Sequence, residues 1–532
     1  MAKNAFTQSE NIKEEYCASI IRVGEVTPVE NSDFLVKTII GGFPIVCNKA
    51  DIKSGDVVIY CKNETELDKK FLSVNNMFEM GSRELNTNYE EVQKLLDEGK
   101  DDEAKKHVGF FNKHGRVKMI RLRGCPSMGI IIGLKPLLNW KSELSANEDL
   151  ESYLTKDENG NEIPFNFDTV CGEKFIKAYV PKVNVRRSGG GNKKSKHVKK
   201  LERFNRLIEG TFAFHYDTKQ LNDNMWRITP DSNVVISIKL HGTSAIFSNI
   251  LTKIPLKLNW WDRLVNKCVK FASKFVSDKL EYIKKHSVQD YITVYDDVYS
   301  SRKVIKNEFI NPNATAGNGY YSVDVWSWMN EKLSKYLWKG MTVYGEIVGF
   351  EPGTSKYIQN TPGNYDYGCE TGTCKFMPYR ITILNPDGTK YEMNVADVKA
   401  WTEMMMLMPD LKDIMLPIPI LYEGTLKDLY PDINTENHWH ENVLERMKEY
   451  DIPKNDKIFG MEEDEPLCKN KVPREGIVIR INDDPVAEAF KLKSLVFLAK
   501  EAKNIDKGIV DAEMAEEYSD GDSTEEGSEE NV

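Results

Sequence analysis

The sequence predicts an α+β fold in two parts, a β-rich N-terminal module and a larger C-terminal domain of strands with helical insertions. Short apolar runs broken by glycine-containing turns dominate residues 16 to about 140. Apolar strands that carry single charged residues recur from residue 233 to residue 494, with longer helical patterns between them. At 532 residues and 40% hydrophobic content, the chain is long enough for several domains with ample core.

The N-terminal module is expected to span residues 1–180. Its apolar runs predict short strands, and the charged segment Asn88–His107 predicts a helical insertion between them. The runs are Ser19–Val26, Phe34–Ile40, Pro44–Cys47, Val57–Tyr60, Arg116–Arg123 and Met128–Leu134. Five or so short strands around one helix favour a small β-barrel of the OB type.

One strand of this module is strongly basic. Cations recur at alternate or near-alternate positions, so that on a half-buried strand they would form one basic face. They are Arg116, Lys118, Arg121 and Arg123. Two interpretations carry equal weight: a nucleic-acid-binding surface, as OB-type modules often have, or an ordinary solvent-facing side of a sheet.

Two segments of biased composition flank the second domain, which is expected at 205–508. Residues 181–204 hold three consecutive glycines and nine Lys or Arg, which predicts a linker that binds phosphates electrostatically or is merely soluble. Residues 509–532 form an acidic tail. Its ten acids, with no Lys or Arg, account for the net charge of −10 and leave 72 residues of each sign elsewhere. We expect a disordered end that solubilises the chain or mimics nucleic acid at a basic groove.

The second domain is organised around residues 233–249. Val234–Ile238 predicts a buried strand, Lys239 ends it, and the tight turn Gly242–Ser244 follows at once. A lysine held there is a salt-bridge partner, a side chain that extends to solvent, or a nucleophile whose pKa is lowered by its surroundings. The pattern K-x-x-G is too short to decide among these three.

Three later strands carry charges that favour the nucleophile. Glu346 lies within the apolar run 343–349, and Glu475 precedes another apolar strand at 476–480. Lys491 and Lys493 alternate along 487–494 and so point to one face. Together they supply two carboxylates for a divalent metal and two cations for phosphates. Each charge also has an ordinary explanation, as a structural ion pair or a solvated face.

These residues fall in segments that resemble the motifs of the covalent nucleotidyltransferases, which comprise RNA ligases, DNA ligases and capping enzymes. KLHG at Lys239 is similar to the nucleophile motif, and SSRK at 300–303 to the short motif that follows it. YGEIVG, EGIVIR and KLKS are similar to the third, fourth and fifth motifs, and CKFMPYRITI at 374–383 to the intermediate strand. The resemblance implies an ATP-grasp-like domain built on antiparallel sheets.

The resemblance also implies roles for single residues. Lys239 would carry covalent AMP from ATP, and Lys491 and Lys493 would contact the α-phosphate. Glu346 and Glu475 would bind Mg²⁺ or Mn²⁺, with Glu346 also near the ribose. Arg302 would hold a phosphate or the ribose. Phe376 would stack on adenine, with Tyr379 on the same segment as the alternative.

The order of the modules resembles the fifth RNA ligase family in particular, where the OB module precedes the catalytic domain. GDVVIY at 55–60 and RLRG at 121–124 are similar to that family's N-terminal module. About 39 residues follow Lys493, so we expect no C-terminal OB domain of the kind found in capping enzymes and most DNA ligases. The implied function is RNA ligase joining 3′-hydroxyl and 5′-phosphate ends in RNA repair. A DNA ligase, a GTP-dependent capping enzyme and a non-catalytic binding protein remain alternatives.

The expected partner is RNA, in a nicked duplex or an RNA/DNA hybrid, with no membrane and no protein partner predicted. Apolar and basic residues at helical spacing in 251–285 predict an amphipathic helix, for which core packing is the default explanation. A nucleic-acid-facing or membrane-surface helix is the alternative. No long apolar stretch or secretory signal is apparent, and nine scattered cysteines fit a reducing cytoplasm. Cys369 and Cys374, like His438 and His440, lack zinc-site spacing.

Overall fold

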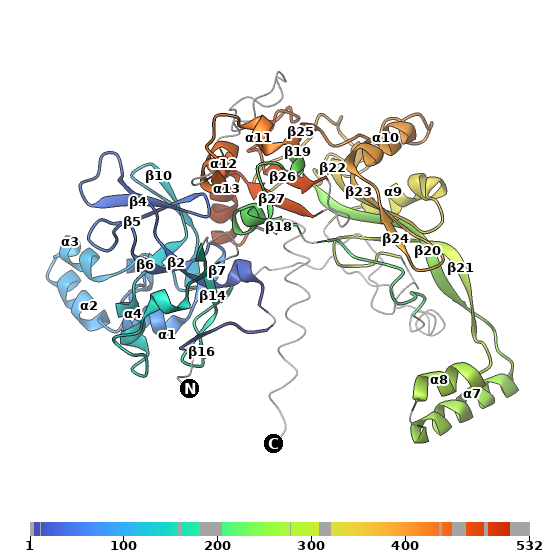
Figure 1. The fold of residues 1–532 in the computed structure, drawn as a ribbon, viewed down its shortest axis with the longest axis horizontal. Helices are drawn as coiled ribbons and strands as arrows, with labels where there is room; N and C mark the ends of the chain where they lie inside the picture. Colours follow the sequence, from blue (N-terminus) through green and yellow to red (C-terminus); the bar gives the residue numbers. More distant parts are fainter. Residues whose placement is uncertain are drawn as a thin grey trace.

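We describe a computed structural model of the chain (Figure 1). It describes residues 5–510 except 11, 157–161, 181–204, 217, 277, 308–320, 436–438, 449–463 and 483–487. The predicted basic linker at 181–204, His438 and nearly all of the predicted acidic tail therefore lie outside the described residues. Within the described ranges, no helix combines the length and the apolar character needed to cross a bilayer.

The N-terminal module consists of several small sheets. The predicted strands are present as β2 (Ala18–Arg22), β4 (Leu35–Ile40), β5 (Phe43–Asn48), β6 (Val57–Cys61), β9 (Met119–Leu122) and β11 (Ile130–Ile132). A four-stranded sheet has the order β11-β6-β2-β14, where β14 is Phe165–Phe167, and β3 (Val26–Pro28), β4 and β5 form a separate sheet. The predicted helical insertion is confirmed by α2 (Tyr89–Asp97) and α3 (Asp101–Ala104).

The hydrogen-bonded strands described in this module do not close into a barrel, so the expected OB-type barrel is not confirmed. The basic strand is interrupted after two residues, giving β8 (Arg116–Val117) and then β9. β8 pairs with β7 (Thr65–Leu67), whereas β9 pairs with β10 (Cys125–Met128). Because consecutive strands join different small sheets, the ladder of backbone hydrogen bonds is not continuous around a barrel.

The C-terminal domain contains two five-stranded sheets. The first has the order β18-β27-β26-β19-β25 and the second β21-β20-β22-β23-β24. The first comprises β18 (Lys219–Gln220), β19 (Asn233–Lys239), β25 (Ile420–Thr425), β26 (Gly476–Ile481) and β27 (Ala489–Lys493). The second comprises β20 (Thr243–Pro255), β21 (Tyr291–Ser300), β22 (Met341–Gly349), β23 (Cys374–Leu384) and β24 (Lys390–Glu392). All pairings are antiparallel except β18 with β27, so the expected mixed fold with antiparallel sheets is present.

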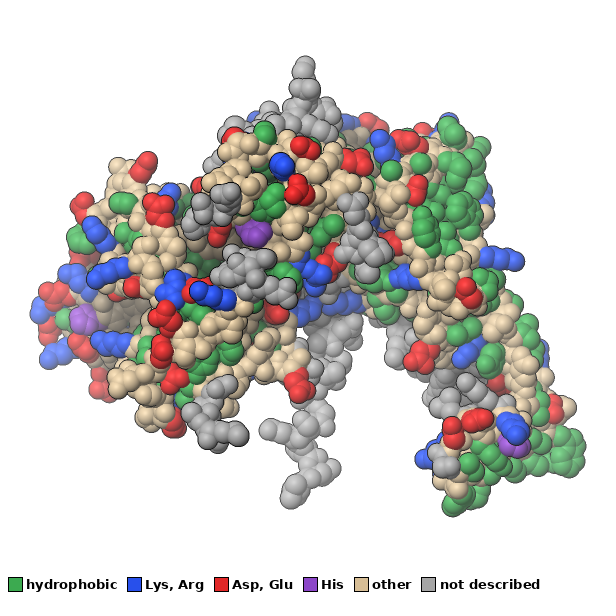
Figure 2. Space-filling view, viewed as in Figure 1, with side chains coloured by type: hydrophobic (Ala, Val, Ile, Leu, Met, Phe, Trp, Pro, Cys, Tyr) green, Lys and Arg blue, Asp and Glu red, His purple; other side chains and the backbone are tan. Residues whose placement is uncertain are grey.

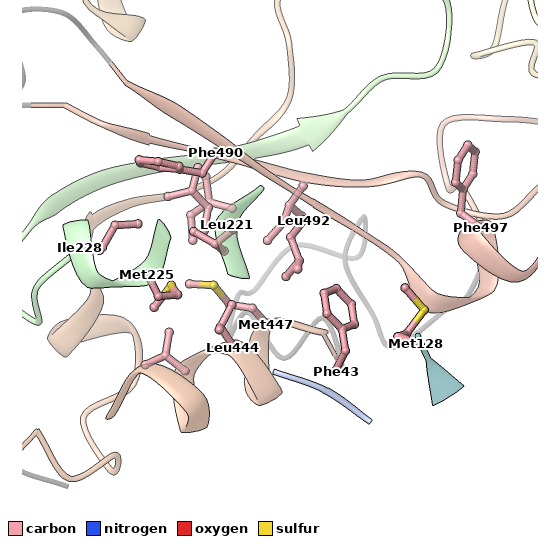
Figure 3. Packing of buried hydrophobic residues seen from close by; sticks show 14 of the residues in the cluster. Phe43, Met128, Leu221, Met225, Ile228, Leu444, Met447, Phe490, Leu492 and Phe497 are labelled. Carbon is pink, nitrogen blue, oxygen red and sulfur yellow. The ribbon is translucent and has the colours of Figure 1, made fainter. Parts of the chain in front are cut away.

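The two parts of the chain share one hydrophobic core. Phe43 and Met128 of the N-terminal module belong to the same buried cluster as Leu221, Leu492 and Phe497 of the C-terminal domain (Figure 3). Helices α12 (Trp439–Lys448) and α13 (Leu495–Asp506) contribute to this cluster. The second sheet has its own core with α9 (Val325–Leu333) and α10 (Val395–Met405). Burial of apolar surface therefore joins the N-terminal module to the first sheet.

The amphipathic insertion does not pack into either core. β20 and β21 extend away from the body as a two-stranded ribbon, and α7 (Trp260–Ala272) and α8 (Lys279–His286) cap its far end (Figure 1). No residue of α7 is buried. The default explanation of core packing is therefore wrong for this helix, because the ribbon carries it away from the apolar surfaces it would need to contact.

Candidate active site

A cavity of about 360 Å³ lies between the two five-stranded sheets. Its walls come from β19, β26 and β27 on one side and from β20, β22 and β23 on the other, with residues of α10 and of the segment before β18. This volume falls in the range of small-molecule pockets, about 300–1,000 Å³. Six of the seven predicted nucleotide-site residues line it: Lys239, Arg302, Glu346, Glu475, Lys491 and Lys493.

Strand pairing brings the predicted lysines together. Lys239 of β19 lies opposite Gly476 of β26, and Gly476 lies opposite Lys493 of β27. Alternation along β19 sends Ile236 and Ile238 into the core, while Ser237 and Lys239 face the cavity. A Cβ on Gly476 would lie 2.1 Å from the carbonyl oxygen of Leu492, so only glycine fits between the two lysine-bearing strands.

Glu475 is a buried carboxylate that lies close to three basic side chains of the cavity. Its side chain is 4% exposed, and its Oε1 lies 2.7 Å from Lys239 Nζ and 4.0 Å from Lys493 Nζ. His241 Nδ1 lies 3.6 Å from Oε2. Burial alone would raise the pKa of Glu475, but Lys239, His241 and Lys493 outweigh it and hold that pKa well below its usual value. Glu475 is therefore a fixed negative charge in the cavity.

The two lysines of β27 have different surroundings. Burial is the main reason that the pKa of Lys491 is lowered to about 8, and the charges of Lys493, Lys239 and Arg302 add to this effect, against Glu15. Lys493 Nζ instead lies 2.9 Å from Glu501 Oε1, on α13. Lys239, Arg302, Lys491 and Lys493 are thus four of the cations that line the cavity, and clustered cations suit a polyphosphate.

Glu346 is the one residue of β22 that is not buried. Its Oε1 accepts a hydrogen bond of 3.0 Å from the backbone N–H of Gly242, three residues after Lys239. A Cβ on Gly242 would lie 2.3 Å from the carbonyl oxygen of Ile347, so the turn can approach β22 only because this residue is glycine. The turn that joins β19 to β20 therefore ties Glu346, in the second sheet, to the residues that follow Lys239, in the first sheet.

The carboxylates fit a magnesium ion that is shared with a substrate. Among the described residues, no group of three or more His, Cys, Asp or Glu side chains is arranged as a metal site. Mg²⁺, however, is commonly bound by one or two carboxylates together with substrate phosphates. Glu346 and Glu475 line the same cavity as the cations and could supply those carboxylates.

His241 is a site residue that sequence reasoning missed. Its ring is buried, with Nε2 2.5 Å from the carbonyl oxygen of Thr361, and its backbone N–H donates to Tyr367 Oη at 2.7 Å. It places an imidazole ring beside Glu475, in addition to the amines of Lys239 and Lys493. In the sequence, only its position inside KLHG points to His241. A single histidine between an apolar residue and a glycine is not part of any periodic pattern.

Phe376 does not reach the cavity. It is fully buried in the core of the second sheet, with its ring 5.1 Å from that of Phe247. The pairing of β22 with β23 shifts register at Tyr344/Gly345, which leaves Tyr379 as the extra residue of a bulge. Tyr379 lines the cavity, and its hydroxyl lies 2.7 Å from His215 Nδ1. The predicted stacking role of Phe376 is therefore corrected, and Tyr379 is the aromatic residue of this segment at the site.

The predicted basic face of the N-terminal module is divided between two environments. Arg116 has no exposed side-chain surface and pairs with Glu64 at 2.6 Å and with Asp506 of α13 at 3.0 Å. Lys118 pairs with the same Asp506 at 2.6 Å. Arg121 and Arg123 are exposed. The expectation of one four-residue nucleic-acid surface is corrected, because Arg116 and Lys118 join the N-terminal module to the C-terminal domain.

The cavity between the two sheets thus brings together a lysine, two carboxylates and further cations. No protein-family model and no curated protein matches the chain. Among solved structures, it is similar to Naegleria gruberi RNA ligase. A mutant of that ligase with ATP and Mn has a TM-score of 0.48 and 16% identity, with 91% of this chain and 98% of that chain covered.

Two further structures of the same ligase give similar values. A mutant with AMP and Mn has a TM-score of 0.48 and 16% identity, covering 92% of this chain and 99% of the other. The ligase with PPi has a TM-score of 0.47 and 15% identity, covering 91% and 98%. With TM-scores below 0.5, these similarities do not by themselves assign a function to this chain.

Proposed function

We propose that the protein is an ATP-dependent RNA ligase that works through covalent AMP on Lys239. The observation that carries the proposal is the convergence of Lys239, Glu475, Lys491 and Lys493 in one cavity, from strands far apart in the sequence. A nucleophilic lysine, fixed carboxylates and clustered cations are the groups that attack on a nucleoside triphosphate requires.

In the first step, Lys239 Nζ attacks the α-phosphorus of ATP. The N–P bond forms as the bond to pyrophosphate breaks, giving lysyl-AMP. Attack requires an unprotonated amine, so Lys239, whose side chain is 22% exposed, releases a proton to water and loses its contact with Glu475 before the bond forms. Lys491, Lys493 and Arg302 stabilise the negative charge that develops on the phosphates.

A bound Mg²⁺ or Mn²⁺ would add charge neutralisation at the phosphates, with Glu346 and Glu475 as its protein ligands. The low pKa of Glu475 keeps this carboxylate ionised and able to bind a cation throughout the physiological range. Tyr379 and the apolar residues Pro378, Ile418 and Ile420 line the same cavity and would surround the base.

In the later steps, the AMP moves to the 5′-phosphate of a nucleic-acid end, releasing Lys239. A 3′-hydroxyl then attacks that phosphate, a phosphodiester bond forms and AMP leaves. RNA is the proposed substrate because the N-terminal module precedes the catalytic motifs and resembles that of the fifth RNA ligase family. The exposed Arg121 and Arg123 are the remaining candidates for backbone contacts.

The test is the intact mass of the full chain after incubation with ATP and Mg²⁺. We expect one added AMP in the wild type, none in Lys239→Ala, and wild-type labelling in Lys412→Ala, an exposed lysine away from the cavity. An adduct formed with GTP and not with ATP would instead indicate a capping enzyme. No adduct with either nucleotide would overturn the proposal.

The sealed substrate is tested separately with nicked duplexes that differ only in the sugar at the junction. We expect sealing when the 3′-hydroxyl strand is RNA. Sealing of an all-DNA nick with no use of RNA ends would replace RNA ligase by DNA ligase and leave the lysyl-AMP step intact.

A further inference from the structure

The tip formed by α7 and α8 carries several large hydrophobic side chains that are exposed to solvent. At roughly 3.3 Å per residue, the 13-residue strand β20 spans about 40 Å between the cavity and the tip. β20 pairs with β22 as far as Ser248 and with residues 206–207 at Thr252 and Lys253, and β21 runs along its other edge to Pro255. The tip therefore projects from the body on a narrow ribbon (Figure 1).

The apolar face of α7 is turned to solvent. Trp260, Trp261 and Phe271 of α7 are 64%, 65% and 64% exposed, and Phe275 of the 3₁₀ helix Ser273–Phe275, which continues α7, is 78% exposed. Leu264 and Val265 lie between these rings and are 41% and 42% exposed. Figure 2 shows hydrophobic side chains gathered over this tip. Isolated exposed apolar residues are normal, but a continuous aromatic and aliphatic helix face marks an interaction surface.

The opposite side of the same helix is basic. At about 100° per residue, the apolar side chains of 260–275 occupy one half of the helix and its four cations occupy one arc of the other. These cations are Arg263, Lys267, Lys270 and Lys274, against the single acid Asp262. The basic arc adjoins the edge formed by Trp260 and Phe271, so cations border the apolar face.

Hydrogen bonds within the tip hold α7 in place. Asn259 caps α7 by accepting from the Asp262 N–H at 2.9 Å. Asn266 exchanges two hydrogen bonds with the backbone of Val288, at 2.9 and 2.7 Å, which ties the helix to the chain after α8. These bonds lie on the polar side of α7 and leave its apolar side open. The ordered helix thus presents its aromatic face away from α8.

We propose that this tip binds the surface of a lipid bilayer that contains anionic lipids. Trp, Phe and Leu on one face with Lys and Arg on the other is the pattern of a helix that lies in the membrane interface. The net charge of the helix complements anionic headgroups, which attract each nearby Lys or Arg. This proposal departs from the expectation, based on the sequence, that the protein has no membrane partner. A helix that lies on the bilayer surface does not need to span it, and no helix in the described ranges could do so.

Two other occupants fit the face less well. The rings contact one another in two pairs, Trp260 with Trp261 and Phe271 with Phe275, at centroid distances of 4.1 and 5.6 Å. The exposed aliphatic residues Leu264 and Val265 continue the apolar face between these pairs, and a site that stacks bases on aromatic rings does not require them. A second copy of the chain would bring two basic arcs of the same sign beside one another. An anionic bilayer satisfies both the apolar half and the basic half of the helix.

The test is flotation of the full chain with vesicles of phosphatidylcholine alone or mixed with phosphatidylglycerol. We expect flotation with the mixed vesicles, weakened by salt, and little with phosphatidylcholine alone. Trp261→Ser with Phe275→Ser should abolish it. Lys270→Gln with Lys274→Gln should weaken partitioning by roughly fivefold per lysine. Trp338→Ser, an exposed tryptophan outside the tip, is the matched control and should float normally.

Thermal melting of each variant reports folding without reference to any enzymatic activity, so the outcome is independent of the proposed ligase function. Absence of flotation at low salt would overturn the proposal, as would flotation that persists in the Trp261/Phe275 double variant. Concentration-dependent dimerisation that the double variant loses would assign the face to a second copy. Loss of RNA binding in that variant, with no vesicle binding by wild type, would assign it to nucleic acid.

Discussion

Two pairs of cations in this protein have the same spacing in the sequence and different surroundings in the structure. Lys491 and Lys493 of β27 point into the cavity between the two sheets, beside Lys239. Arg116 and Lys118 have the same spacing, yet both pair with Asp506 at the junction of the two parts. Alternation determines that two cations share a face, but the chain packed against that face determines whether they bind a ligand or hold the fold together.

The largest expected effect concerns the cavity side of this comparison. Lys493→Met removes a cation that we propose contacts the α-phosphate, while keeping an unbranched side chain of similar length. We expect lysyl-AMP formation to slow by roughly 10²–10³-fold, the usual loss when one group that stabilises developing charge is removed. The rate is measured by single-turnover labelling with ATP. A melting temperature that collapses with the rate would show that Lys493 is structural.

The junction side should behave in the opposite way. Arg116→Met leaves Glu64 and Asp506 without their shared cation, and we expect a loss of roughly 2–3 kcal/mol in the free energy of unfolding. Breaking a fully buried ion pair costs about 3–5 kcal/mol. We expect a smaller loss here because both carboxylates are partly exposed and can be hydrated. Denaturant unfolding measures the loss. Lysyl-AMP formation by the folded variant should stay near wild type, and a large kinetic defect would contradict a purely structural role.

The lowered pKa of Lys491 predicts a pH dependence. Below a pH of about 8 this lysine is protonated and attracts phosphates, and above it the free protein loses that charge. ATP affinity should therefore fall as pH rises through about 8, by at most about tenfold per pH unit. Equilibrium binding to the Lys239→Ala variant, which cannot be labelled, measures the affinity. Lys491→Arg keeps its charge at this pH, so the decrease in ATP affinity should disappear in this variant. If the variant shows the same pH dependence as the parent, Lys491 is not the group that titrates.

The smallest expected effect concerns the two basic residues that the junction leaves exposed. Arg121→Ser and Arg123→Ser should leave stability and lysyl-AMP formation unchanged. If each contacts one phosphate, the slope of log affinity for duplex RNA against log salt should drop by roughly 0.9 per residue. Salt titrations of binding give this slope. Identical slopes for wild type and the double variant would show that Arg121 and Arg123 do not contact the RNA.

Much of the C-terminal domain could be predicted from the sequence. The strands that carry Lys239, Glu346, Glu475, Lys491 and Lys493 are where apolar periodicity placed them, and the cavity brings these residues together. Each side chain follows directly from its position along a strand, since alternation assigns the face. Their catalytic roles stay predictions that the labelling experiments address.

Other features depended on pairings that no local pattern encodes. Phe376 and Tyr379 lie three residues apart, and a bulge at Tyr379 decides that one enters the core and the other the cavity. Arg116 meets Asp506 across 390 residues of chain, which strand periodicity could not indicate. His241, in the turn after β19, lies beside Glu475, which precedes β26.

The sequence by itself determined the strands and helices, the face of each charged residue and the amphipathic character of α7, because these properties depend on neighbours within a few positions. Only the tertiary structure decided what each face meets: a cavity for β27, the C-terminal helix α13 for Arg116, and solvent for the aromatic side of α7. The physical reason is that periodicity is a local property, whereas burial and ion pairing are set by segments hundreds of residues away.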